Sequence, residues 1–173
     1  MITALVVIVL LLAAALAFVA SRPNTFTVLR ATTIKAPPEK IFPLINDLHG
    51  FNTWNPFAKM DPEMKLSYSG PQAGRGAAYA WESRRMGVGS MEIVDTAPPS
   101  KVILKLDFLK PFEGHNVVEF TLQPKGDATN VTWEMRGPMA FIPKIMNLFV
   151  STDKMVGGQF EMGLADMKAV AER

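Results

Sequence analysis

The chain is 173 residues long, which suits one globular domain and leaves little room for a second. Its 18 lysines and arginines against 16 aspartates and glutamates give a net charge of +2, too small for the strong basic field of a nucleic-acid-binding protein. The absence of cysteine excludes disulfides, thiolate catalysis, zinc–thiolate sites and iron–sulfur clusters, and two histidines argue against a histidine-rich metal site. We therefore expect no metal, no cofactor and no nucleic-acid partner.

The first residues form an apolar run that is typical of a membrane-spanning helix. From Ile2 to Ala20 no side chain is charged, and Thr3 carries the only polar one. With a rise of about 1.5 Å per residue, roughly 19 helical residues nearly span a hydrocarbon core of about 30 Å. The sequence therefore predicts a single transmembrane anchor over residues 1–21, followed directly by a domain over residues 22–173.

A cleaved signal peptide is the alternative for this segment. Ala15-Leu16-Ala17 fits a cleavage site, but no lysine or arginine precedes the apolar run, which also exceeds the usual length of about 7–15 residues. Arg22, Arg30 and Lys35 follow the run, so the positive-inside rule favours a domain on the cytoplasmic side of the membrane.

The next segment predicts a strand and then a helical region. Residues Thr25 to Ile34 are rich in β-branched side chains, which favour a strand. Pro37-Pro38 suits the first turn of a helix, and Pro43 should shorten or kink that helix. We expect the helix to end at His49-Gly50 and an irregular aromatic segment to fill residues 51–57.

Six further strands are predicted, about ten residues apart and separated by turns that contain glycine or proline. Their ranges are Met64–Ser69, Gly76–Ser83, Val88–Thr96, Lys101–Phe108, His115–Gln123 and Asn130–Arg136. Connections this short favour antiparallel hairpins over parallel crossovers. A four-residue turn at Pro124–Asp127 would pair Gln123 with Ala128.

The chain is predicted to end in a long helix, capped by Ser151, Thr152 or Asp153. The inner side chains of this helix recur at helical spacing and are Val156, Phe160, Leu164 and Met167. We expect the apolar segment 141–150 before it to pack over the mouth of a cavity. The alternative is that this segment touches a bilayer, with Lys144 among the lipid head groups.

Two pairs of glycines predict close approaches between chain segments. Gly87-Val88-Gly89 lacks the third glycine of a dinucleotide-binding loop and predicts a bulge or close packing within a strand. Gly157-Gly158 weakens the start of the final helix or lets another group approach its backbone closely.

This order of elements predicts an α+β fold in which a curved antiparallel sheet covers its apolar face with the final helix. Alternation along the strands places Tyr79 and Trp81 on one face, and Phe120 and Trp133 on one face. A strongly curved sheet leaves space between itself and the helix. Large apolar side chains should border that space.

We expect eleven residues to line a cavity for a ligand, since they are bulky and lie on the inner faces of these elements. They are Trp54, Phe57, Tyr79, Trp81, Leu106, Phe108, Phe120, Trp133, Met135, Phe149 and Phe160. The alternative is an ordinary filled core, which aromatic and methionine stripes form more often than a pocket. Methionine, of which the chain has 11, suits adaptable apolar sites.

Five short segments resemble the START/Bet v 1-like (SRPBCC) superfamily, in particular its members of polyketide cyclase/dehydrase type. They are Ile34–Phe42, Asn46-Asp47, Trp54-Asn55-Pro56, Gly87–Ile93 and Asn130–Trp133. The resemblance covers residues 25–172 and implies the helix-grip fold, in which a curved antiparallel sheet and a long C-terminal helix enclose a hydrophobic cavity. The superfamily contains both enzymes and binding proteins, so the resemblance does not fix the activity. The apolar N-terminal run is a departure from its soluble members.

Asp107 and His115 are the best candidates for an acid–base pair, because a hairpin that pairs Phe108 with Gly114 sets them side by side. Strand alternation places both on the outward polar face, so we expect a surface pair and assign no catalytic residue. Tyr79 is the polar side chain expected to point into the cavity, where it can donate to a ligand carbonyl or satisfy a backbone group.

Three functions remain open at this point. The first is a membrane-anchored domain that binds a lipid or another hydrophobic small molecule, driven by apolar burial worth about 25 cal/mol per Å². The second is an enzyme of polyketide cyclase or dehydratase type, which requires an ionisable group in the cavity wall. The third is a non-catalytic interaction module with a filled core. The sequence leaves the ligand, the oligomeric state and any protein partner open.

Overall fold

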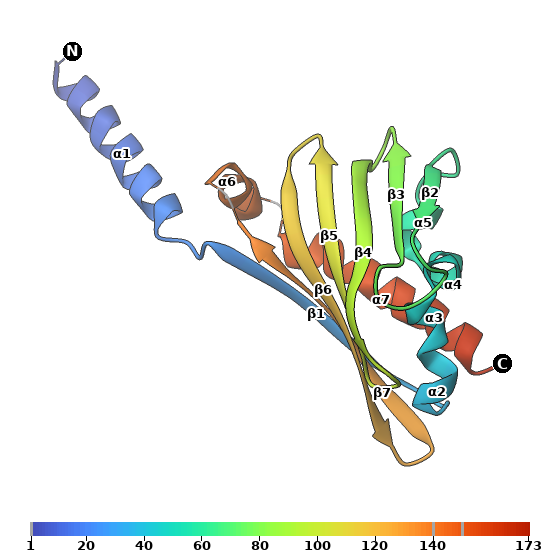
Figure 1. Cartoon of the computed structure of the whole chain (residues 1–173). Helices are drawn as coiled ribbons and strands as arrows, with labels where there is room; N and C mark the ends of the chain where they lie inside the picture. Colours follow the sequence, from blue (N-terminus) through green and yellow to red (C-terminus); the bar gives the residue numbers. More distant parts are fainter. Residues whose placement is uncertain (1, 140, 150) are drawn as a thin grey trace.

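A curved antiparallel sheet packs against one long helix, and a chain of short helices closes the space between them (Figure 1). The computed structural model describes the backbone of residues 2–139, 141–149 and 151–173, and the side chains of residues 6–139, 143–145, 147–148 and 151–173. The elements in chain order are α1 (Ile2–Ala20), β1 (Thr25–Ile34), α2 (Pro38–Ile41), α3 (Pro43–Asn46), α4 (Leu48–Trp54), α5 (Pro56–Lys59), β2 (Lys65–Ser69), β3 (Ala78–Ser83), β4 (Gly87–Ala97), β5 (Lys101–Lys110), β6 (Gly114–Lys125), β7 (Ala128–Pro138), α6 (Phe141–Phe149) and α7 (Thr152–Ala171).

The sheet has the strand order β1-β7-β6-β5-β4-β3-β2, and every neighbouring pair is antiparallel. β1 joins the sheet beside the last strand, so the two ends of the domain's chain meet at one edge. The predicted α+β fold, with its antiparallel sheet and long C-terminal helix, is therefore confirmed.

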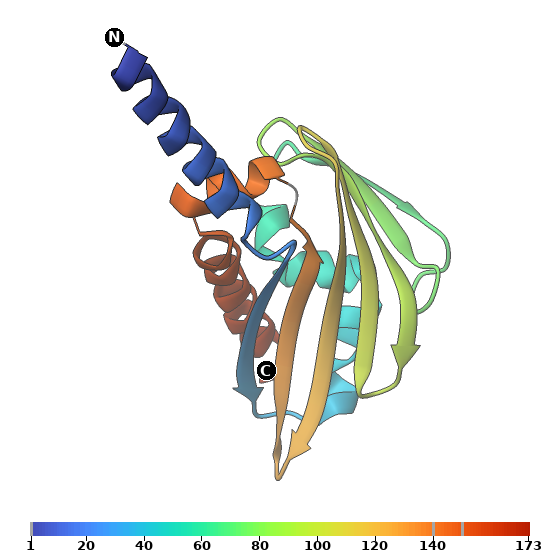
Figure 2. The ribbon, with the colours of Figure 1, turned by 90° about the vertical axis from the view of Figure 1, so that its left-hand side faces the viewer.

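The apolar N-terminal run forms helix α1, which projects from one end of the domain (Figure 2). Its large described side chains from Val6 to Phe18 are at least half exposed, with Leu11 at 65%, whereas Val19 is buried. Within the described part of the chain, no helix combines the length and apolar composition that crossing a membrane requires. The role of residues 1–21 as a membrane anchor therefore stays a prediction.

The helical region differs from the predicted single helix, because two side chains start new helices inside it. The Asp47 carboxylate accepts hydrogen bonds from the backbone N–H groups of His49 and Gly50, which makes it the N-cap of α4. His49-Gly50 therefore begins a helix instead of ending one. Asn55 caps α5 in the same way by accepting from Phe57 N, so the segment predicted as irregular is largely helical.

The turn between β6 and β7 is two residues shorter than predicted. Lys125 pairs with Ala128, and Gly126 takes the positive φ that a tight hairpin requires. Gln123 therefore pairs with Asn130, and the predicted pairing with Ala128 is wrong. Because the register differs by two residues, each side chain keeps its predicted face, and Phe120 lies directly opposite Trp133.

Helix α7 is held to β1 by Arg30, which passes over the helix at Gly157. The Arg30 guanidinium forms ion pairs with Asp153 at 2.9 Å and with Glu161 at 2.7 Å. A Cβ atom on Gly157 would overlap that guanidinium. The predicted close approach at this glycine is therefore confirmed, and it lets the sheet edge and the helix lie side by side.

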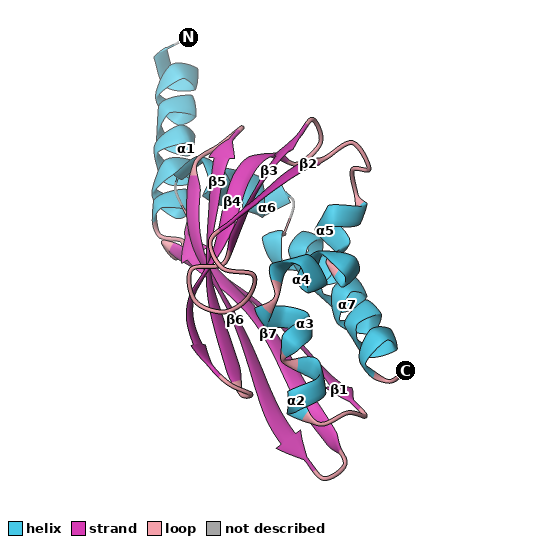
Figure 3. Cartoon of the chain, turned by 45° about the vertical axis from the view of Figure 1, so that its right-hand side comes forward, coloured by secondary structure: helices cyan, strands magenta, loops and turns pink. Residues whose placement is uncertain are grey.

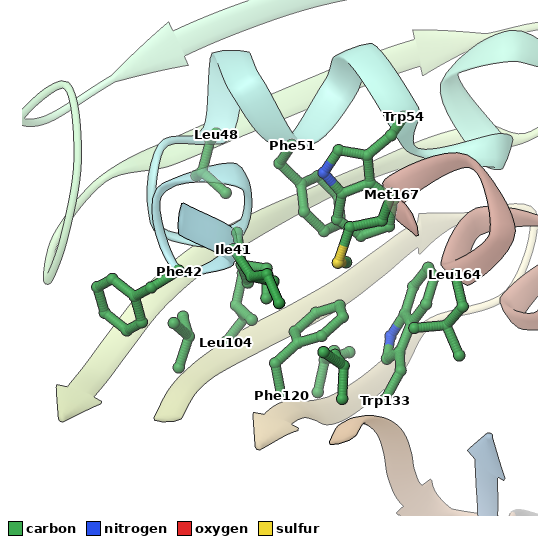
Figure 4. Packing of buried hydrophobic residues seen from close by; sticks show 14 of the residues in the cluster. Ile41, Phe42, Leu48, Phe51, Trp54, Leu104, Phe120, Trp133, Leu164 and Met167 are labelled. Atoms are coloured by element: carbon green, nitrogen blue, oxygen red, sulfur yellow. The ribbon is translucent and has the colours of Figure 1, made fainter. Parts of the chain in front are cut away.

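The closed half of the space between sheet and helices is a packed aromatic core (Figure 4). Trp133 stacks on Phe160 of α7, with ring centroids 3.9 Å apart, and meets Trp54 of α4 edge-on at 5.5 Å. Phe51 meets both tryptophans edge-on. Phe120 makes edge-on contacts with Phe51 and with Trp54. These contacts join the sheet to both helices.

Candidate functional site

A cavity lies beside the aromatic core, in the same space between sheet and helices. Its volume is about 100 Å³, measured as the space open to the centre of a water molecule. Seventeen side chains from β3 to β7 and from α4, α5, α7 and nearby loops line it: Phe51, Asn52, Asn55, Phe57, Ala58, Met64, Tyr79, Trp81, Met86, Met91, Leu106, Phe108, Val118, Trp133, Met135, Val156 and Phe160. The exposed wall of this cavity is almost wholly apolar.

The lining residues divide into a buried floor and a half-buried mouth. Tyr79, Met91, Leu106 and Met135 are buried strand residues of the floor. The mouth is formed by half-buried side chains of the β3–β4 and β5 tips, of α5 and α7, and of the loop before β2. They are Phe57, Ala58, Met64, Met86, Phe108 and Val156. The cavity therefore opens at one end, between these tips and the start of α7.

Eight of the eleven predicted residues line the cavity. They are Phe57, Tyr79, Trp81, Leu106, Phe108, Trp133, Met135 and Phe160. Their contact with a ligand stays a prediction. The side chain of Phe149 lies outside the described residues.

Trp54 and Phe120 do not line this cavity as expected, and their contact with a ligand stays a prediction. Trp54 is fully buried in the packed half, where its indole Nε1 donates to the Leu44 carbonyl at 2.7 Å. Phe120 lies two residues farther along β6 than Val118, which does line the cavity. Strand alternation gave the correct face for Phe120, but it contains no information about depth along the strand.

Nine lining residues are not among the eleven predicted ones, although Val156 was predicted on the inner face of the final helix. Met91 and Val118 alternate with outward polar neighbours, so their inward face could have been predicted. The others come from α4, α5, α7 or loops and are Phe51, Asn52, Asn55, Ala58, Met64, Met86 and Val156. No described side chain of α6 lines the cavity, so the expected cover of the mouth by residues 141–150 is not seen in that part of the chain.

Trp81 owes its position in the cavity wall to a glycine on the next strand. Gly89 lies opposite Trp81 in the β3–β4 ladder, and a Cβ atom at Gly89 would overlap the Trp81 ring. The β4–β5 register also shifts between Val88 and Gly89, which is a bulge. Both roles expected for the Gly87–Gly89 segment are present.

The polar groups near the cavity are few and mostly bonded to one another. Asn55 donates to Asn52 Oδ1 at 3.0 Å, and Asn52 donates to the Tyr68 hydroxyl at 3.1 Å. Burial raises the pKa of Tyr79, so its phenol stays protonated and can act as a hydrogen-bond donor. The indole Nε1 of Trp133 has no acceptor among the described residues. Any acid–base chemistry in this part of the wall would depend on Tyr79.

Asp107 and His115 form the predicted pair, but on the outer face of the sheet. They are paired in the β5–β6 ladder, Phe108 pairs with Gly114 as expected, and His115 Nδ1 lies 2.7 Å from Asp107 Oδ1. Lys105 donates to the other Asp107 oxygen at 2.8 Å. Neither Asp107 nor His115 lines the cavity.

His115 is expected to titrate above its ordinary pKa of 6.5, because the hydrogen bond to Asp107 stabilises the imidazolium. This contribution to stability is complete below the unfolded-state pKa and is lost as the pH rises through the raised folded-state pKa. An NMR titration of the imidazole should show the higher midpoint, and Asp107→Asn should lower it by more than Glu113→Gln does. An unchanged midpoint in Asp107→Asn would contradict the assigned cause.

Among the described residues, no group of three or more His, Asp or Glu side chains is arranged to hold a metal ion. A family model described as "polyketide cyclase / dehydrase and lipid transport" matches residues 25–172, which is the whole domain after α1. The chain belongs to this polyketide cyclase/dehydrase and lipid transport family. No curated protein gives a significant match.

Solved structures share the fold of this family member at low sequence identity. The major latex-like protein 151 of Panax ginseng has a TM-score of 0.63 and 16% identity, over 87% of this chain and 100% of its own. Protein CV1439 from Chromobacterium violaceum has a TM-score of 0.62 and 15% identity, over 88% and 99% of the two chains. DynU16, a putative protein in the dynemicin biosynthetic locus, has a TM-score of 0.60 and 15% identity, over 86% and 47%. These likenesses show that the chain shares the helix-grip fold of these proteins.

Proposed function

We propose that the domain binds a lipid or another hydrophobic small molecule in the internal cavity, and that residues 1–21 anchor it to a membrane. The cavity with its almost wholly apolar wall is the observation that carries the proposal. Membership of a family described by lipid transport and polyketide cyclisation adds to it. Removal of apolar ligand surface from water, at about 25 cal/mol per Å², would supply the binding energy.

The size of the cavity limits what enters without adjustment. A dry apolar cavity of about 150 Å³ accepts one benzene molecule, so about 100 Å³ accommodates a short alkyl segment or part of one ring. A longer ligand would extend through the mouth or displace flexible side chains. Met64, Met86, Met91 and Met135 line the cavity, and methionine changes shape at low cost. We therefore expect a ligand with one apolar end inside and the rest near the mouth.

The proposed anchor is the whole apolar segment, residues 1–21. The side chains of residues 1–5 lie outside the described part of the chain. Residues 2–20 form one helix of 19 residues without a charged side chain. Arg22 follows it directly, and its guanidinium lies 4.4 Å from the centre of the Phe18 ring. An arginine at the end of an apolar helix can reach the membrane–water interface. The positive-inside rule still favours the cytoplasmic side for the domain.

An enzyme of cyclase or dehydratase type is the second candidate, and Tyr79 is the observation that favours it. Its phenol is buried at the cavity floor and stays protonated because burial raises its pKa, so it could donate a hydrogen bond that polarises a substrate carbonyl. The third hypothesis, an interaction module with a filled core, has lost its main support because the described interior contains a cavity.

Binding can be tested by tryptophan quenching in phosphatidylcholine vesicles that contain the full chain, whose three tryptophans include Trp81 and Trp133 in the cavity wall. We expect saturable quenching by a dibrominated fatty acid or by a halogenated bicyclic aromatic ketone, chosen as lipid-like and polyketide-like probes. Extraction and mass spectrometry of the purified protein should identify a co-purified apolar molecule. No saturable quenching by either probe and no co-purified molecule would contradict the proposal.

A further inference from the structure

The mouth of the cavity opens at the end of the domain from which α1 projects. In Figures 1 to 3, the tips of the β3–β4 and β5–β6 hairpins, helix α6 and the C-terminus of α1 lie at the upper end of the domain, and the β6–β7 tip and α2 lie at the lower end. Met86 and Phe108 of the cavity mouth belong to those upper tips. We call this region the α1 end, defined by α6, by residues 84–86 and 109–113, and by the C-terminus of α1.

Exposed apolar side chains gather at and beside the α1 end. Eight large hydrophobic side chains are exposed in the described part of the domain after α1, and five lie on these tips, on α6, after α5 or in the first turn of α7. These five are Met60, Leu109, Phe112, Leu148 and Met155. Phe112 is the most exposed at 66%. The bulge at Val88 leaves Leu109 without a partner on β4. Such a concentration of exposed apolar groups marks a contact surface.

Cationic side chains surround these apolar ones. Arg84 and Arg85 are exposed on the β3–β4 tip, where Asp61 lies near Arg85, and Lys110 is exposed on the β5–β6 tip, where Glu113 is an acidic neighbour. Apolar side chains interspersed with arginine and lysine suit a surface that dips into the head-group region of an anionic bilayer. This charge pattern favours lipid over a second copy of the same surface, because two copies would place these cations against one another.

The linker that follows α1 is held at this surface by a buried lysine. Lys144 of α6 is 5% exposed, and its Nζ donates to the Arg22 carbonyl at 2.8 Å and to Asn24 Oδ1 at 2.6 Å. Met139 N also donates to the Asn24 carbonyl, at 2.7 Å. The linker between α1 and β1 is therefore tied to α6 and is not a loose tether. If α1 spans a bilayer, the α1 end must face that bilayer.

We infer that the α1 end rests on the bilayer with Leu109 and Phe112 in the head-group region, so that the cavity mouth faces the lipid and an apolar ligand enters from it. This inference rests on the proposed function, because it requires both the anchor and a ligand in the cavity. It adds the route of the ligand: the apolar molecule passes between membrane and cavity without crossing bulk water.

Depth labelling tests the orientation of the domain on the bilayer. Because the chain has no native cysteine, a label reacts only with the cysteine that is introduced. The full chain is reconstituted in vesicles of phosphatidylcholine and phosphatidylglycerol with one cysteine at a time, Leu10→Cys, Phe112→Cys or Asp127→Cys. A fluorescent label on each cysteine is then challenged with lipids that carry a nitroxide quencher, and separately with iodide in the water. We expect lipid-borne quenching at positions 10 and 112 but only iodide quenching at position 127, on the opposite β6–β7 tip.

The other outcomes separate the two proposals. Lipid quenching at position 10 with position 112 as water-exposed as position 127 would overturn the orientation and leave the anchor intact. A label at position 10 that lipid quenchers do not reach would overturn the anchor and the orientation together. A label at position 112 that is reached by neither quencher would mean that a second protein chain covers the tip, which also overturns the inference.

The ligand route predicts a separate kinetic effect. The double variant Leu109→Gln/Phe112→Gln should slow transfer of the dibrominated fatty acid from vesicles to the cavity by about threefold or more, while the final extent of quenching stays the same. Met162→Gln removes a similarly exposed apolar side chain from the middle of α7 and should not slow it. Equal transfer rates in both variants would overturn the route.

Discussion

Trp133→Ala is expected to lower the free energy of unfolding by about 3–5 kcal/mol, the usual cost of removing a large buried aromatic side chain. Trp133 is 2% exposed and stacks on Phe160, and its ring also contacts Trp54 and Phe120. Its removal would therefore break the main aromatic link between the sheet, α4 and α7. The lost volume would also enlarge the cavity, which adds a cavity cost to the lost burial.

Chemical denaturation followed by circular dichroism measures this loss in the full chain. Met162→Ala is the matched control, because Met162 is 54% exposed on α7 and its truncation should stay within about 0.5 kcal/mol. A loss below about 1 kcal/mol in Trp133→Ala would contradict the assigned role of the ring.

Two tryptophan-to-phenylalanine variants separate the ring from its N–H group. Trp54 Nε1 donates to the Leu44 carbonyl, whereas Trp133 Nε1 has no acceptor among the described residues. Trp54→Phe would leave a buried carbonyl unpaired, at about 1–3 kcal/mol, and Trp133→Phe would remove an unsatisfied donor. We therefore expect Trp54→Phe to be the more destabilising of the two.

The elements that the sequence predicts well are those with a regular period. The first strand and the final helix follow from runs of β-branched residues and from apolar side chains at helical spacing, and both are confirmed with bounds close to those predicted. The pairing of Asp107 with His115 follows from counting residues across one short hairpin. In each case the information lies within a few residues of the element itself.

The parts that could not be predicted depend on contacts between distant segments. Asn52 lies in the seven-residue α4 and Asn55 caps the four-residue α5, and both helices are too short to show a period. The Asp47 cap was a readable signal, since aspartate is a preferred N-cap, but the adjacent His49-Gly50 was interpreted as a helix end. Some inward residues border the cavity and others pack in the aromatic core. This division depends on where α4 and α7 lie along the strands.

Val118→Phe is expected to weaken binding of the dibrominated fatty acid by about tenfold or more, which corresponds to about 1.4 kcal/mol. Val118 is 2% exposed on β6 and lines the cavity, so a phenylalanine ring there would occupy much of its volume of about 100 Å³. Because the ring fills existing space, the stability of the fold should stay unchanged or rise. Tryptophan quenching measures the affinity, and thermal unfolding measures the stability.

Val131→Phe is the matched control for this test. Val131 is a fully buried strand residue outside the cavity lining, where the same added volume should overpack the core and cost about 1–3 kcal/mol. The folded fraction of that variant should bind the probe as the original chain does. Met91→Phe blocks the cavity from β4 and replaces Val118→Phe if the latter fails to fold. Unchanged affinity in a folded cavity-filling variant would mean that the ligand binds elsewhere, because no ligand can share that space with a phenylalanine ring.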